Sequence, residues 1–174
     1  MTSENQTSFD NQLNPHHSDG LATPVAGSPM GLDEASRALE NKGRRILVVD
    51  SDIENADLLV ALMENEGYSV EVATDGNYAL MLADKFEPQL ILLGLDLPGM
   101  SGPEVAHILH TEPRYAQRFR FTRIFYVTGK DLMIQKRFDS LPGTPMSDYI
   151  FTPIDIPELL EKVSRAFGDQ PSSS

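Results

Sequence analysis

The sequence has 174 residues, 40% of them hydrophobic and 23% charged, a composition typical of one globular domain with additional polar chain. It contains no cysteine, which excludes disulfides, cysteine-ligated metals and thiol catalysis. The formal net charge of −12 disfavours DNA and anionic membranes as partners. No apolar run approaches the ~18 residues of a membrane span. The first 31 residues carry no Lys or Arg and no apolar segment of a signal peptide. We therefore expect a cytoplasmic protein that neither binds DNA nor inserts into a membrane.

The chain changes character near residue 43. Residues 1–31 are rich in Ser, Thr, Asn, Gly and Pro and show no apolar period, so we expect them to be disordered. Apolar residues at helical spacing allow a short helix over 32–41. We predict a disordered acidic tail over 1–43, one folded domain over 44–168 and a disordered end over 169–174.

Within that domain, strand and helix patterns alternate five times. Short apolar runs predict strands, and apolar residues three and four apart predict helices. The strands are expected at 45–50, 68–73, 89–95, 124–128 and 148–152, and the helices at 53–67, 77–86, 103–111, 131–141 and 157–167. This order predicts an α/β fold, a doubly wound parallel sheet with helices on both faces. In such sheets the functional residues lie beyond the carboxyl ends of the strands.

The residues at those strand ends resemble the receiver domain of bacterial two-component response regulators. The segments that carry the resemblance are ILVVDSD, ENEGYSVEVATDGNYAL, PQLILLGLDLPGMSG, IFYVTG and DYIFTPIDIPELLEKV, which together span about residues 44–168. The resemblance implies a flavodoxin-like (βα)5 fold with strand order 2-1-3-4-5. It also implies a cis peptide bond before Pro153.

The departures from the family's pattern concern the phosphorylation site. Gly94 stands where the family has its phospho-accepting aspartate, Ser51 at the second position of the acidic pair, and Thr152 where the family has a lysine. Asp50, Thr128, Tyr149 and Pro153 keep the family's residue types. Asp96 lies two residues beyond Gly94, at the position whose backbone carbonyl binds the metal in the family.

Transfer of a phosphoryl group to an aspartate needs a carboxylate nucleophile, a divalent cation held mostly by carboxylates, and a fixed cation. Gly94 removes the first, Gly94 with Ser51 weakens the second, and Thr152 removes the third. We therefore predict a degenerate site of Asp50, Ser51, Gly94, Thr128 and Thr152, with no catalysis, no cofactor and no magnesium. If a metal binds at all, Asp50 and Asp96 are the candidate ligands. Asp50 is otherwise a polar residue that binds backbone groups.

A second unusual feature is the segment 114–123 (RYAQRFRFTR), which is positively charged although the chain as a whole is acidic. Arg114, Arg118, Arg120 and Arg123 alternate there with aromatic residues, and no acid is present. Arginine beside aromatic rings can bind phosphates and bases, as in receiver-like proteins that bind cyclic di-GMP. The alternative is a polar loop with a phenylalanine in the core and arginines paired to surface acids.

These observations lead to one preferred function and two alternatives. We expect a stand-alone degenerate receiver, not an enzyme, that binds a signalling protein independently of phosphorylation, because only about six residues follow the last predicted helix. The expected partner-binding face contains Ile134, Phe138, Tyr149 and Glu158. The first alternative is a conventional regulator that accepts phosphate on Asp96. The second is a receiver that responds to cyclic di-GMP through the arginine segment.

Overall fold

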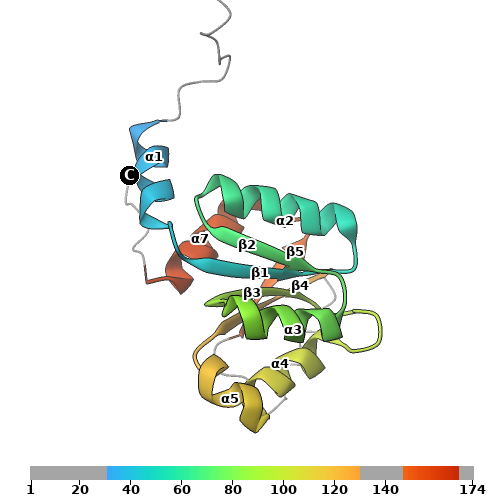
Figure 1. Cartoon of the computed structure of the whole chain (residues 1–174). Coiled ribbons are helices and arrows are strands. Elements are labelled where there is room, and N and C mark those ends of the chain that lie inside the picture. Colours follow the sequence, from blue (N-terminus) through green and yellow to red (C-terminus); the bar gives the residue numbers. More distant parts are fainter. Residues whose placement is uncertain (1–30, 130–146, 169–174) are drawn as a thin grey trace, which may run out of the picture. The chain divides into compact units, whose positions relative to one another are not determined.

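The computed structural model describes residues 31–129 and 147–168 (Figure 1). The chain divides into two compact units, 1–36 and 37–174, and the whole sheet belongs to the second. The strands are β1 (Arg45–Val49), β2 (Ser69–Ala73), β3 (Leu90–Gly94), β4 (Arg123–Gly129) and β5 (Ser147–Thr152). The helices are α1 (Leu32–Glu40), α2 (Ile53–Asn65), α3 (Gly76–Phe86), α4 (Gly102–Thr111), α5 (Pro113–Phe119) and α7 (Ile156–Ala166).

The five strands form one parallel sheet in the order β2-β1-β3-β4-β5. The central strands β1 and β3 are continuous apolar runs, and their residues are buried apart from the first residue of β1. Such runs are expected where helices cover both faces of a parallel sheet. The predicted fold class and strand order are confirmed.

Two apolar layers hold the helices against the sheet. In Figure 1, α3, α4 and α5 cover one face, and α2 and α7 cover the other. Leu47, Leu93 and Phe119 belong to the first layer, whereas Leu59 and Val163 belong to the second. Burial of these side chains is the main stabilising term of the fold.

Helix caps fix the loops that follow the strands. The side chains of Asp52, Asp75 and Asp155 accept hydrogen bonds from backbone N–H groups in the first turns of α2, α3 and α7. Ser101 and Glu104 form a reciprocal capping box at the start of α4. All four helices therefore begin at the carboxyl edge of the sheet, which sets the shape of that edge.

The structure differs from the expectation at one described helix. Residues 113–119, expected as part of a loop, form α5, whose first residue is a proline. The side chain of Phe119 is 1% exposed and anchors this helix in the core, so packing stabilises a segment that was expected to be a loop.

The helix expected over 131–141 lies outside the described residues. The Thr152–Pro153 bond is cis, as the resemblance implied. Within the described ranges, no helix combines the length and apolar character needed to cross a membrane.

Candidate functional site

A cavity of about 210 Å³ opens at the carboxyl edge of the sheet, between the ends of β1, β3, β4 and β5. The described residues lining it include every member of the degenerate site that the sequence pointed to, and none is Lys or Arg. The lining consists of Asp50, Ser51, Asn55, Gly94, Leu95, Asp96, Val127, Thr128, Gly129 and Thr152. Asn55 was missed by the sequence reasoning. The sequence could have indicated Asn55, because this residue lies in the first turn of the helix that follows Asp50 and Asp52.

Asp50 follows β1 and is 8% exposed. Its Oδ1 accepts a hydrogen bond of 2.9 Å from the backbone N–H of Asp52. Burial raises the pKa of Asp50, and the Asp52 charge adds to the rise, whereas the hydrogen bond from Asp52 opposes it. The carboxylate thus carries an electrostatic penalty that no described cation in the cavity relieves.

Gly94 ends β3 directly beside Asp50. A Cβ on Gly94 would lie 3.6 Å from the Asp50 Cα and 3.2 Å from the Val49 carbonyl oxygen. An acidic side chain there would therefore start next to the first carboxylate. With glycine present, no carboxylate projects from this position of β3, and Asp50 and Asp96 are the acidic residues that line the cavity.

Ser51 connects the two loops that border the cavity. Its Oγ donates a hydrogen bond of 3.1 Å to the backbone carbonyl of Asp96. In the receiver pattern that carbonyl faces the metal, and here a neutral hydroxyl occupies one of its lone pairs. The Asp96 residue is exposed and lies beyond the end of β3. Among the described residues, no cluster of three metal-ligating side chains occurs.

The other two strands bring hydroxyls to the cavity. Thr128 donates a hydrogen bond of 3.3 Å from Oγ1 to the carbonyl of Gly129. Thr152 pairs with Gly129 across β4 and β5. Its side chain supplies a hydroxyl at the position where the resemblance to receiver domains implies a lysine.

Tyr149 is packed inside the β4–β5 side of the domain. Its ring lies 5.9 Å from that of Tyr126 and 6.2 Å from that of Phe151, measured between centroids, and it is 9% exposed. Lys162 Nζ donates a 2.6 Å hydrogen bond to the Tyr149 carbonyl and pairs with Asp148 and Glu158. Burial opposes the Lys162 charge, but the bonds to both carboxylates raise its pKa overall.

The expected partner-binding face is described only in part. Glu158 is exposed and bound to Lys162, and Tyr149 lies beneath the surface rather than on it. Ile134 and Phe138 lie outside the described residues.

The four arginines of segment 114–123 do not act as one group. Arg114 and Arg118 pair with Asp84, and Arg118 also pairs with Glu87. The guanidinium groups lower the pKa of Asp84, chiefly through the Arg114 hydrogen bond. Arg120 stacks over Phe121 with 4.5 Å from its guanidinium carbon to the ring centroid, and Arg123 donates to the Arg165 carbonyl. Pairing to surface acids, one of the two readings of this segment, therefore describes Arg114 and Arg118.

The fold and this edge of the sheet agree with the comparisons to known proteins. The model of the response regulator receiver domain matches residues 46–164. The chain therefore belongs to the receiver domain family of two-component response regulators.

Individual relatives support this assignment. The DNA-binding response regulator MtrA of Mycobacterium bovis is 31% identical over 137 residues, which cover 77% of this chain and 56% of that protein. The chain thus spans about half the length of the curated relatives it matches. Among solved structures, the receiver domain of the sensor histidine kinase PA1611 from Pseudomonas aeruginosa, with magnesium in its active site cleft, has a TM-score of 0.63 at 23% identity over 73% of this chain and 99% of that one. The chemotaxis response regulator CheY4 of Vibrio cholerae has a TM-score of 0.61 at 23% identity over 71% of this chain and 98% of that one.

These relatives correct the expectation about partners. The net charge of −12 led us to exclude DNA, but the curated relatives at about 31% identity are DNA-binding response regulators. That exclusion is wrong because a charge summed over a whole chain does not describe a local surface. The comparisons also give no support to cyclic di-GMP as a ligand.

Proposed function

We propose that this chain is a degenerate receiver domain that binds another signalling protein without accepting phosphate. The observation that carries the proposal is the cavity at the carboxyl edge, where Gly94 replaces the nucleophile and no described lining residue is cationic. We place its action in the cytoplasm, without a cofactor or magnesium, and without enzymatic activity of its own.

The Ser51 hydrogen bond supports the same conclusion. In a phospho-accepting site, a cation joins the acidic pair to the loop after the third strand. Here the hydroxyl of Ser51 joins these two loops directly through the Asp96 carbonyl. We infer that the bond replaces the cation as the link across the cavity, so that the loop keeps its position without ligand.

The packing of Tyr149 supports independence from phosphorylation. The resemblance implies that Thr128 and Tyr149 couple the site to the partner-binding face. The Tyr149 ring packs beside the rings of Tyr126 and Phe151, and its backbone carbonyl accepts a hydrogen bond from Lys162. A side chain held in this way favours one conformation of the face at β5 and α7, whatever occupies the cavity.

The test is the mass of the intact protein after incubation with acetyl phosphate and Mg²⁺. We expect no stoichiometric gain of a phosphoryl group, whereas a receiver domain with its aspartate present, treated in parallel, gains one. A gain that disappears in the variant Asp96→Asn would overturn the proposal and establish Asp96 as the acceptor.

A further inference from the structure

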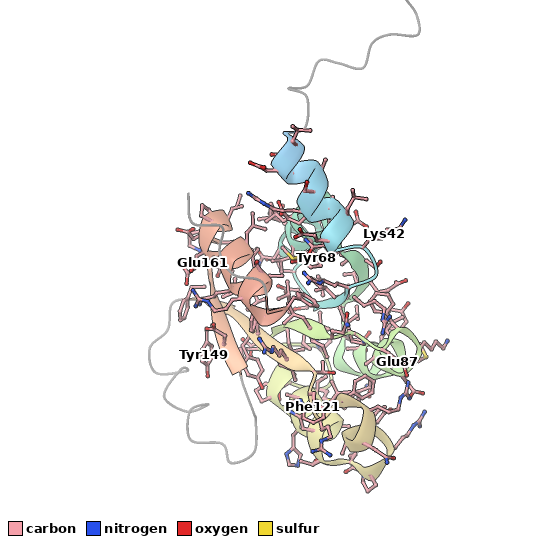
Figure 2. The ribbon with its side chains drawn as sticks, turned by 90° about the vertical axis from the view of Figure 1, so that its left-hand side faces the viewer. Lys42, Tyr68, Glu87, Phe121, Tyr149 and Glu161 are labelled. Carbon is pink, nitrogen blue, oxygen red and sulfur yellow. The ribbon has the colours of Figure 1, made fainter. Side chains whose placement is uncertain are left out.

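A second cavity, of about 340 Å³, lies at the opposite end of the sheet, where β1, β3 and β4 begin. Figure 2 labels Glu87 and Phe121, two of the residues that line it. The full lining consists of Arg45, Glu87, Pro88, Gln89, Arg118, Phe119, Phe121 and Thr122. The proposed function uses none of these residues.

Backbone and side-chain bonds make this corner rigid. Thr122 is buried, and its Oγ1 donates a 3.1 Å hydrogen bond to the Pro88 carbonyl. Arg45 donates from Nε to the Glu87 carbonyl at 2.9 Å, and its backbone N–H donates to Gln89 Oε1 at 3.0 Å. A surface held in this way loses little conformational entropy when a ligand binds.

The corner carries more positive than negative charge. Arg45 and Arg118 line the cavity, Arg114 shares Asp84 with Arg118, and Arg120 stacks over the lining residue Phe121, whereas Asp84 and Glu87 are the carboxylates that pair within this group. Those two acids bind Arg114 and Arg118. Within the described ranges, Arg45 and Arg120 have no carboxylate within ion-pair distance. Arg45 uses its Nε for the Glu87 carbonyl, so its terminal N–H groups and those of Arg120 are the donors that can meet carboxylates of an external partner.

An exposed aromatic ring lies among these arginines. Phe121 is 79% exposed, whereas Phe119, two residues earlier, is 1% exposed. The Arg120 guanidinium covers one part of the Phe121 ring. An exposed aromatic ring beside guanidinium groups has the composition of protein interfaces, which are enriched in aromatic residues and arginine.

We propose that this corner, defined by Arg45, Arg120 and Phe121, binds an acidic segment of a partner protein that carries an apolar side chain. Carboxylates of the segment pair with the arginine guanidinium groups, and its apolar side chain packs against Phe121 at the mouth of the cavity. The inference goes beyond the proposed function, because it concerns a surface at the other end of the sheet.

The local chemistry favours an acidic peptide as the occupant. Phe121 offers one exposed apolar ring beside the cavity, which suits a single apolar side chain flanked by carboxylates. A short acidic segment meets mainly the local excess of arginine. Arginine forks also match the geometry of a carboxylate.

The probe is a fluorescein-labelled peptide in which one phenylalanine is flanked on each side by three glutamates, titrated by anisotropy with the full chain at low salt. We expect saturable binding, weakened about tenfold or more by Arg120→Glu and severalfold by Phe121→Ala, because each removes a direct contact. Both side chains are exposed, so both variants should fold. Lys42→Glu is the matched control, because it reverses a charge on an exposed residue that lies apart from Phe121 in Figure 2, and we expect less than a twofold effect.

Two further probes identify the chemistry of the partner. A peptide with glycine in place of phenylalanine should bind more weakly, and oligothymidylate should bind more weakly than the acidic peptide. Tighter binding of oligothymidylate would overturn the proposal in favour of a nucleic acid. Absence of saturable binding, or binding unchanged in both corner variants, would also overturn it. Neither result affects the phosphorylation test.

Discussion

The two ends of the sheet use charged residues in opposite ways. At the carboxyl edge, aspartates cap helices, and Asp50 stays buried without a described cation. At the amino edge, arginines exceed the acids that pair with them, and an aromatic ring is exposed. The parallel topology produces part of this polarity, because acids are favoured at helix N-termini and bases at C-termini. A net charge of −12 therefore conceals surfaces of opposite sign.

The largest difference in stability is expected between alanine variants of two phenylalanines at the amino edge of the sheet, Phe119 and Phe121. Phe119→Ala removes a ring that is 1% exposed and should lower the free energy of unfolding by about 3–5 kcal/mol. Phe121→Ala removes a ring that is 79% exposed and should change it by about 0.5 kcal/mol or less. Urea unfolding of both variants measures the difference. Equal losses would show that Phe121 packs in the fold and is not available to a partner.

The next effect concerns glycines at the carboxyl edge. A Cβ on Gly102 would lie 2.2 Å from the Gly94 carbonyl oxygen, so Gly102→Ala must displace backbone and should destabilise the domain by about 2–3 kcal/mol. Gly129→Ala is the matched control, because among the described residues, chain neighbours apart, the nearest atom to its Cβ would be Thr152 Oγ1 at 4.0 Å. Denaturant unfolding of both variants is the measurement. A Gly102 variant as stable as the control would mean that the loop after β3 is not fixed against Gly94.

A smaller effect tests the link between the loops. Ser51→Ala removes the hydrogen bond to the Asp96 carbonyl, which should cost about 1 kcal/mol or less and speed amide exchange in the loop after β3. Hydrogen exchange followed by NMR measures this. Unchanged exchange at residues 96–100 would show that the hydroxyl does not hold the loop.

The smallest effect is a gain of stability at Asp50. Because its folded pKa is raised, the folded state binds a proton more tightly than the unfolded state, and stability falls as pH rises from the ordinary aspartate range through the folded pKa. Asp50→Asn should therefore raise the melting temperature by a few degrees at most near neutral pH, and the gain should vanish in acid. Thermal melts at both pH values measure the gain. A gain independent of pH would mean that the penalty is not electrostatic.

The fold and the members of the cavity were predictable because the signals are local. The runs RILVV and LILLG predict buried strands, and the carboxyl ends of parallel strands must meet at one edge. Gly94, Ser51 and Thr152 could therefore be placed together from their positions after the strands. The bond from Ser51 to the Asp96 carbonyl could not, because it depends on how two loops are oriented.

The amino edge was harder to predict. Pro113 and the spacing of Tyr115 and Phe119 are helix signals, but the segment was expected to be the loop between the helix at 103–111 and the strand at 124–128. The partners of Arg118 lie about thirty residues away in the sequence, at Asp84 and Glu87, and only the packing of α5 beside α3 brings them together. The sequence therefore grouped four arginines that the structure separates into paired and unpaired ones.

The central claim is that the carboxyl edge and the face at β5 and α7 keep one state whatever phosphodonor is present. The most direct measurement is the ¹H–¹⁵N NMR spectrum of the full chain before and after addition of Mg²⁺ and acetyl phosphate. We expect unchanged amide signals for Thr128, Tyr149 and the loop after β3. A second set of signals at these residues, formed with phosphodonor and lost on its hydrolysis, would contradict it.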